Sequence, residues 1–277
     1  MAQPRSATLE RRLVAQVRTG FRRSAHAMRR IGVRSALRYD LQRLRAALGM
    51  AAGAVVLTAK RSRHPLRARP DTSDFIVFGQ TFISQPYAVL DDFPDVDFIV
   101  DGGANVGYAS AFLLTQFPRA QLTAIEPDPE NFAILRENLA PYGSRASAIM
   151  AGLWSHSARL RIVETPYRDG GAWTRQVCEC SPSEPSQIEA IDIPGLLART
   201  GRDRISILKL DIEGSECVVF AAPNVDDWLP RVDCIVVELH DDTHFGRCTD
   251  VFHRAVASQG FSMASSGELT VCRRIGG

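Results

Sequence analysis

The chain has 277 residues, of which 45% are hydrophobic and 23% are charged, and its net charge is +2. This is an ordinary soluble composition, with enough residues for one sizeable α/β core and an extension. The uncharged, mostly apolar run 48–59 is too short for a membrane-spanning helix, which needs ~20 apolar residues. The total charge hides a division: residues 1–70 hold 17 basic and 2 acidic residues, and residues 71–277 hold 16 and 29. We therefore expect two different parts.

Residues 1–70 are expected to form a basic, amphipathic helical arm with a linker at its end. Apolar residues recur every three or four positions between arginines, which is the spacing of one helix face. They are Leu9, Leu13, Val17, Phe21, Met28, Ile31, Val33, Leu37, Leu41, Leu44 and Leu48. The charged, proline-containing run Arg61–Pro70 is typical of a linker, so we place the boundary near Asp71 and a second domain over 71–277.

The arm has several interpretations. Its apolar stripe can pack on the second domain or on another copy of the chain in a homo-oligomer, and this interpretation is slightly favoured. It can also attach to an anionic membrane surface, through its arginines and apolar residues. Nucleic-acid binding is less favoured, because the arm has few aromatic residues for stacking. An organellar transit peptide would have the same arginine-rich, acid-poor composition.

The cysteines indicate a reducing compartment. All 6 are scattered, and none forms a Cys-x-x-Cys pair. Cys178 and Cys180 are close in sequence, but no further zinc ligands stand near them. With no evident signal peptide, we expect a cytoplasmic protein, with peripheral membrane attachment through the arm as the alternative.

Strand and helix patterns alternate beyond Asp71. Strands are expected over 75–78, 98–100, 122–125, 148–153, 188–191, 205–210 and 234–237. Helices are expected over 109–117 and 129–139 and after Pro194, Ser215 and Thr249. This alternation predicts an α/β fold with a doubly wound, mostly parallel, Rossmann-like sheet. The segment 165–186 has no clear element and is either a lid that binds a substrate or a surface insertion.

Four of the predicted strands are followed directly by an acidic residue. These residues are Asp101, Glu126, Asp211 and Glu238. In a doubly wound sheet, ligands bind beyond the carboxyl ends of the strands, so we expect the four carboxylates to share one edge. Lys209 is expected inside a strand, where it either pairs with one of these acids or contacts a bound substrate.

The run Asp101-Gly-Gly-Ala-Asn-Val-Gly107 links a strand directly to a helix. Glycines there let the backbone approach a ligand, and the helix start offers free N–H groups, so the run predicts a nucleotide-cofactor site. Glu126, nineteen residues after Gly107, can accept the hydroxyls of a ribose. NAD and S-adenosylmethionine both fit, and the carboxylate of Asp101 favours the ammonium of a methionyl group over a pyrophosphate.

Four motifs in order resemble the FkbM-type methyltransferase family. They are Asp101–Gly107, Ala124-Ile-Glu-Pro-Asp128, Leu208-Lys-Leu-Asp-Ile-Glu-Gly-Ser-Glu216 and Val236-Val-Glu-Leu-His240. The resemblance implies a class I methyltransferase fold, S-adenosylmethionine as donor, and a hydroxyl acceptor on a sugar, glycolipid or polyketide-like molecule. It also implies that Glu126 binds the ribose and that the methionyl part is held by Asp101, Gly102, Gly103, Asn105 and Gly107.

A hydroxyl acceptor must lose its proton, and three residues at the acidic edge could take it. These are His240, Asp211 and Glu213. A less favoured alternative is that Mg²⁺ binds to them together with Glu238, so no metal ligand is assigned. Trp154 either stacks on the adenine or belongs to the core. An NAD-dependent oxidoreductase and a non-catalytic membrane or assembly module remain the alternative functions.

Overall fold

The computed structural model describes residues 25–50, 53–70, 72–163, 176–181, 183–185 and 188–275. It divides into two compact units, Met1–Ser84 and Gln85–Gly277. The first unit contains helical residues 25–31 and then α2 (Val33–Ala47), β1 (Val55–Leu57), β2 (Leu66–Ala68), α3 (Asp74–Gly79) and the π-helix Gln80–Ser84. Residues 1–24 of the expected arm lie outside the described residues.

The first unit corrects two sequence predictions. The expected linker 61–70 contains β2, which pairs antiparallel with β1 and buries Leu66 and Ala68. The expected strand 75–78 is part of helix α3. Phe75 and Phe78 are three positions apart, so a helix places both rings on one face, where each contacts the ring of Tyr39. Strand-forming residue types were therefore outweighed by helical packing.

The second unit is built on a seven-stranded sheet with the order β12-β13-β11-β10-β3-β4-β5. Its parallel part consists of β3 (Phe98–Gly102), β4 (Gln121–Ile125), β5 (Ala146–Ile149), β10 (Ile205–Leu210) and β11 (Val232–Glu238). The hairpin of β12 (Phe261–Ser266) and β13 (Leu269–Arg274) adds antiparallel pairs beyond β11. The prediction of an α/β, mostly parallel sheet is confirmed.

The strand order reverses between β3 and β10. From β3 the chain proceeds outward to β4 and β5, and it later returns to β10 on the other side of β3. The carboxyl ends of strands at such a reversal border a crevice where ligands bind in doubly wound sheets. Asp101 in β3 and Asp211 directly after β10 are at this reversal.

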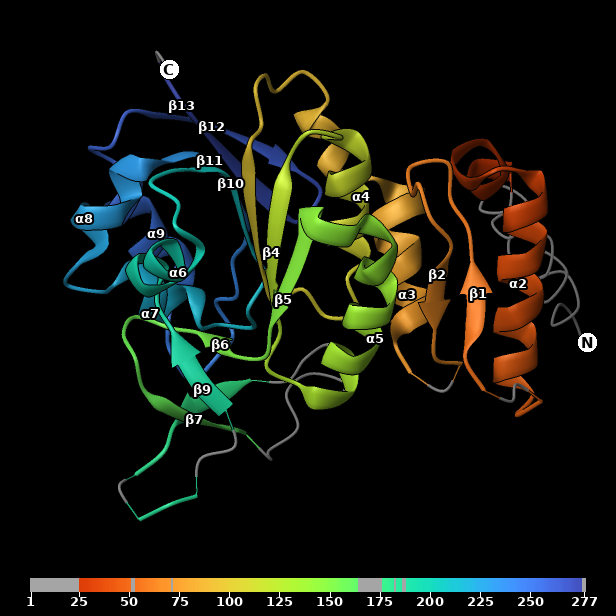
Figure 1. The fold of residues 1–277 in the computed structure, drawn as a ribbon, viewed down its shortest axis with the longest axis horizontal. Coiled ribbons are helices and arrows are strands. Elements are labelled where there is room, and N and C mark those ends of the chain that lie inside the picture. The colour runs from red at the N-terminus through yellow and green to blue at the C-terminus, as the bar shows by residue number, and fades with distance from the viewer. Residues whose placement is uncertain are drawn as a thin grey trace, which may run out of the picture. The chain divides into compact units, whose positions relative to one another are not determined.

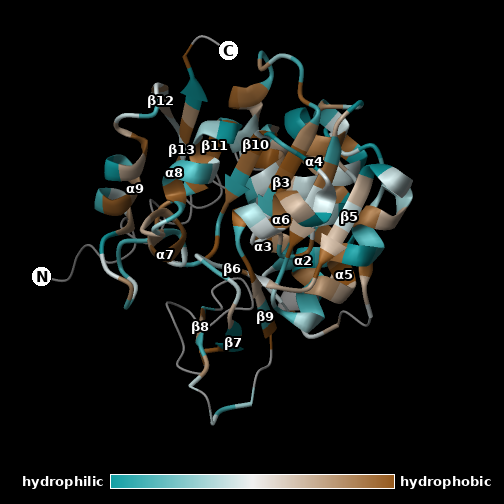
Figure 2. Cartoon of the chain, turned by 60° about the vertical axis from the view of Figure 1, so that its left-hand side comes forward, coloured by the Kyte–Doolittle hydropathy of each residue, from teal (hydrophilic) through white to brown (hydrophobic). Residues whose placement is uncertain are grey.

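Helices cover both faces of this sheet. Helices α4 (Tyr108–Gln116) and α5 (Pro129–Leu139) lie on one side, and α6 (Ile193–Thr200), α7 (Glu216–Phe220) and α9 (Cys248–Val256) lie on the other (Figure 1). Helix α5 begins where sequence predicts, because Asp128 caps it by accepting from the backbone N–H groups of Glu130 and Asn131. The central strands carry mostly hydrophobic colour, as expected for strands buried on both faces (Figure 2).

A smaller sheet follows β5. It has the order β6-β9-β7-β8 and consists of β6 (Gly152–Leu153), β7 (Arg159–Ile162), β8 (Val177–Glu179) and β9 (Ile188–Ile191). The expected strand 148–153 is thus split between β5 and β6, in two different sheets. Of the expected lid 165–186, residues 165–175, 182 and 186 lie outside the described residues, and Val177–Glu179 forms β8. Helix α8 (Val225–Trp228) and the short helices Pro86–Leu90, Ala140–Arg145 and Leu229–Arg231 complete the unit.

Candidate active site

Asp101 is fully buried at the end of β3, where it has two partners. Its Oδ2 accepts a hydrogen bond of 2.5 Å from the Ser110 hydroxyl, and its Oδ1 lies 3.0 Å from Nζ of Lys209. Lys209 is directly opposite Asp101 in the parallel register of β10 and β3. Asp101 therefore anchors the start of the glycine loop, and its contact with a methionyl ammonium stays a prediction.

Lys209 ties together the central strands at the site. Its ammonium donates a hydrogen bond of 2.8 Å to the carbonyl of Gly103 and lies 3.9 Å from a carboxylate oxygen of Asp211. Burial opposes its charge, but the neighbouring Asp101 carboxylate and other nearby groups outweigh burial and raise the pKa of Lys209. The prediction that Lys209 lies in a strand and pairs with an acid is confirmed.

Two glycines of the loop are required by packing within the protein. Gly103 has a φ of +70°, and a Cβ atom there would overlap the carbonyl oxygen of Asp211. Gly107 has a φ of +84°, and its Cβ would lie 2.7 Å from a side-chain carbon of Leu135 on α5. The loop thus passes tightly between the end of β10 and α5. Contact of Gly102, Gly103, Asn105 and Gly107 with a cofactor stays a prediction.

Glu126 reaches back from the end of β4 to hold this loop. Its two carboxylate oxygens accept from the backbone N–H of Asn105, at 2.8 Å, and of Asp128, at 3.0 Å. Burial raises the pKa of Glu126 to about 7, although these two N–H groups favour its ionised form. The structure therefore brings Glu126 to the glycine loop as expected, and its contact with a ribose stays a prediction.

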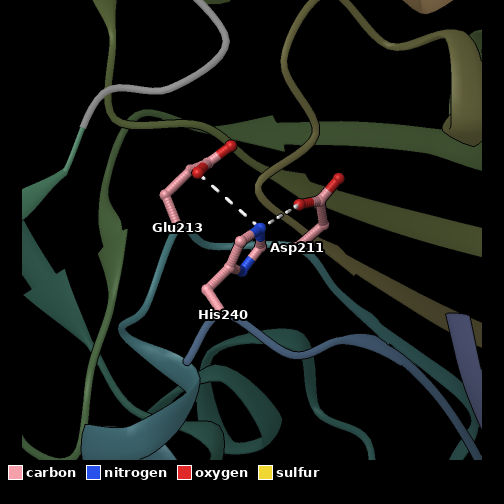
Figure 3. A group of neighbouring side chains, drawn as sticks. All are labelled: Asp211, Glu213 and His240. Atoms are coloured by element: carbon pink, nitrogen blue, oxygen red, sulfur yellow. Dashed lines mark ion pairs between the residues drawn. The ribbon is translucent and has the colours of Figure 1, made fainter. Parts of the chain in front are cut away.

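The three predicted catalytic side chains meet at the carboxyl edge of the sheet (Figure 3). Asp211 directly follows β10, Glu213 stands in the next turn, and His240 lies two residues beyond β11. Nε2 of His240 is 3.9 Å from Asp211 Oδ1 and 3.7 Å from Glu213 Oε2. Glu238 Oε1 lies 3.5 Å from the same nitrogen. The predicted convergence of these acidic strand ends with His240 is therefore present in the structure.

Glu216 positions Glu213 and His240, a role that was not predicted from the sequence. Its buried carboxylate accepts from the backbone N–H of Ile212, at 2.7 Å, and of Gly214, at 2.8 Å. The Oε1 atom also lies 3.1 Å from Nδ1 of His240. One carboxylate thus fixes the turn that carries Glu213 and orients the imidazole. The spacing of Asp211, Glu213 and Glu216 could have indicated this role. A tight turn followed by the start of a helix brings the side chains of three acids at this spacing close together.

Asp211 and His240 differ in solvent exposure and in pKa. Burial opposes the charge of His240, but its contacts with Glu216 and Glu238 outweigh burial and raise its pKa to about 11. Burial raises the pKa of Asp211 to about 6, against the opposing effect of Lys209. The Asp211 side chain is 33% exposed, whereas that of His240 is 1% exposed. Asp211 is therefore the most exposed of the three predicted catalytic side chains.

Trp154 belongs to a small core beside the site. Its side chain is buried with Leu160, Val177 and Ile188, and its ring lies 5.7 Å from that of Phe245, edge to face. The indole N–H donates to a carboxylate oxygen of Glu179 at 2.6 Å. Of the two interpretations of Trp154, the structure supports the core residue.

Known proteins with similar sequences are methyltransferases. The model of the methyltransferase FkbM domain matches residues 101–263, a range that contains every candidate site residue named above. A protein called Methyltransferase 1 from Beauveria bassiana is 28% identical over 180 residues, which cover 58% of this chain and 72% of that protein.

The names of two further relatives also state what those proteins methylate. The 31-O-demethyl-FK506 methyltransferase FkbM of Streptomyces tacrolimicus is 28% identical over 172 residues, covering 52% of this chain and 66% of that protein. The hexuronic acid methyltransferase AglP of Haloferax volcanii is 26% identical over 152 residues, covering 55% of this chain and 59% of that protein.

Proposed function

The chain belongs to the FkbM family of S-adenosylmethionine-dependent methyltransferases, and we propose that it methylates a hydroxyl oxygen of a sugar, glycolipid or polyketide-like acceptor. Family membership decides between the two cofactors that the glycine loop left open, since it identifies an enzyme that uses S-adenosylmethionine rather than NAD. The relative that acts on demethyl-FK506 carries the O-methyl position in its name, and AglP is named for a hexuronic acid. Both names support an oxygen-rich small molecule as acceptor.

The carboxyl edge suits a donor with a positively charged sulfur. Asp211, Glu213 and Glu238 crowd this edge, and such a concentration of carboxylates attracts a sulfonium and repels a pyrophosphate. When bound, S-adenosylmethionine supplies an electrophilic methyl group. In this proposal Glu126 binds the ribose hydroxyls, and the loop of Gly102, Gly103, Asn105 and Gly107, anchored by Asp101, lies against the methionyl part.

The residues beyond β10 and β11 act on the acceptor. Asp211 has the most exposed carboxylate at this edge and takes the proton from the acceptor hydroxyl. His240 lies 3.9 Å from that carboxylate and favours its ionised form, Glu213 lies 3.7 Å from the same ring nitrogen, and Glu216 keeps the imidazole oriented. Positioning of this kind is the main contribution of an enzyme to a displacement in which donor and acceptor must be in line.

The observation that carries this proposal is the convergence of Asp211, Glu213 and His240 in the region that matches the family model. Comparative mass spectrometry of lipid, glycan and metabolite extracts tests it, using cells with the gene and cells in which it carries Asp211→Asn. We expect one compound to lack a single O-methyl group in the variant cells. If the extracts do not differ, Asp211 is not needed for the reaction, and if the missing methyl group belongs on nitrogen or carbon, the proposed acceptor class is wrong.

We also propose that the first unit attaches to an anionic membrane surface through α2. Four apolar side chains on one face of this helix, Val33, Leu37, Leu41 and Leu44, and Leu48 directly after it are 49–62% exposed. Arginines 34, 38 and 45 border this face, given 3.6 residues per turn, and they are exposed too. An apolar stripe beside basic residues is typical of helices that lie in a membrane interface. Among the described residues, no helix is both long and apolar enough to cross a membrane.

Vesicle flotation tests the membrane proposal. The protein should float with vesicles that contain phosphatidylserine and remain in solution with phosphatidylcholine vesicles. The double variant Leu37→Ser and Leu44→Ser should lose flotation while retaining its helical circular dichroism. Equal flotation of the variant and the wild type would rule out α2 as the attachment site, and a concentration-dependent increase in mass without vesicles would assign the stripe to self-association.

A further inference from the structure

The convergence of Asp211, Glu213 and His240 has the form of a metal site. Each residue offers one ligand atom, and the three atoms lie within 4.8 Å of one another. They come from the ends of two adjacent parallel strands, β10 and β11, so the sheet itself sets their spacing. Metal–ligand bonds of about 2.0–2.2 Å place two ligand atoms of one ion roughly 3–4 Å apart, so small side-chain shifts are enough to close the site.

The imidazole of His240 gives independent evidence for a ligand. The residue is 1% exposed, and its Nε2 has no hydrogen-bond partner among the residues that the structure describes. This nitrogen points between Asp211 and Glu213, at 3.9 and 3.7 Å (Figure 3), and its nearest carboxylate oxygen, Glu238 Oε1, is 3.5 Å away, so all three acids stand beyond ordinary hydrogen-bond distance. A buried polar atom without a partner is costly, and an ion at this point would bind it.

The other ring nitrogen is arranged as it is in metal-binding histidines. Nδ1 lies 3.1 Å from Oε1 of Glu216, and because a carboxylate only accepts, Nδ1 is the donor. Metal-ligating histidines commonly donate their second N–H to a carboxylate, which fixes the ring and makes the ligating nitrogen more basic. The ion and a proton then compete for the lone pair of Nε2.

The ligand types select among ions. Mg²⁺ and Ca²⁺ prefer oxygen ligands alone, whereas an imidazole with carboxylates suits first-row divalent ions such as Mn²⁺ and Zn²⁺. We propose that Asp211, Glu213 and His240 bind one divalent transition-metal ion. This inference deepens the proposed function, on which the role of the ion rests: a metal-bound hydroxyl is more acidic, so the ion would bind the acceptor oxygen and favour loss of its proton.

Titration with Mn²⁺ tests the site without any methyl acceptor. Full-length protein is first treated with a chelator and dialysed, and the electron paramagnetic resonance signal of free Mn²⁺ then reports binding. We expect one Mn²⁺ per chain, with affinity reduced about tenfold or more in Glu213→Gln and in His240→Gln. The matched control is Glu268→Gln in the exposed turn between β12 and β13, which should bind as the wild type does.

The outcomes are distinct. Absence of stoichiometric Mn²⁺ binding to wild-type protein would overturn the inference, and so would equal binding by the wild type and a correctly folded Glu213→Gln variant. Calorimetric titration of S-adenosylmethionine into the same samples separates the two proposals. Protein that binds the donor and not Mn²⁺ refutes the metal site alone. Protein that binds Mn²⁺ at these residues but methylates no hydroxyl supports the metal site and refutes the proposed function.

Discussion

Lys209→Met is expected to lower the free energy of unfolding by about 3–5 kcal/mol. The variant removes the ammonium 3.0 Å from Asp101 and leaves that carboxylate buried without its cation. It also removes the hydrogen bond to the carbonyl of Gly103, so the glycine loop loses its tie to β10. Denaturant unfolding monitored by circular dichroism measures the loss.

A double variant identifies the cause. Asp101→Asn combined with Lys209→Met removes both charges, and it should regain part of the lost stability because no buried charge remains unpaired. The matched control is Lys60→Met, which changes the chain's other lysine, an exposed residue; it should cost about 1 kcal/mol or less. If Lys209→Met costs no more than Lys60→Met, the ion pair does not hold the site together.

Asp211→Asn is expected to reduce the rate of methyl transfer by about 10²–10⁴-fold. The amide keeps the size of the side chain but is a far weaker base and a poorer metal ligand. Because Asp211 is partly exposed and the carboxylates of Glu213 and Glu238 remain at this edge, the fold should change little and the affinity for S-adenosylmethionine should fall far less than the rate. Steady-state kinetics with the identified acceptor, together with calorimetric titration of the donor, measure these two quantities separately.

The control for this variant is Asp250→Asn on the exposed part of α9, which should retain the wild-type rate. A wild-type rate in Asp211→Asn would exclude the residue from the reaction. A rate that falls only in proportion to a weakened donor affinity would instead place Asp211 in donor binding.

Much of the parallel sheet could be predicted from the sequence. The runs that end in Asp101, Glu126, Asp211 and Glu238 are buried strands followed by helices, and the rule that ligands bind at carboxyl ends then brings these residues to one edge. The helix starts at Asp128 and Asp192 were also predictable, because each aspartate caps its helix and has a proline within the first two helical positions.

The remaining features depend on tertiary contacts. Phe75 and Phe78 have strand propensity, but their packing on Tyr39 selects a helix. The hairpin of β12 and β13 was not predicted. Its outer strand, β12, has few apolar residues, and residues 262–265 are exposed, so hydrophobic periodicity did not indicate a strand there. At the site, no spacing rule shows that Asp101 is neutralised by Lys209 or that Glu216 holds His240, since both contacts join different strands and turns.

Transfer of a labelled methyl group to oxygen is the most direct test. Purified protein is incubated with S-adenosylmethionine that carries a trideuterated methyl group and with the compound found to be undermethylated in the Asp211→Asn cells. We predict that nuclear magnetic resonance will show one trideuteromethyl group on a hydroxyl oxygen, and that Asp211→Asn will yield almost none. A label on nitrogen or carbon, or equal labelling by the variant, would contradict this function of the site.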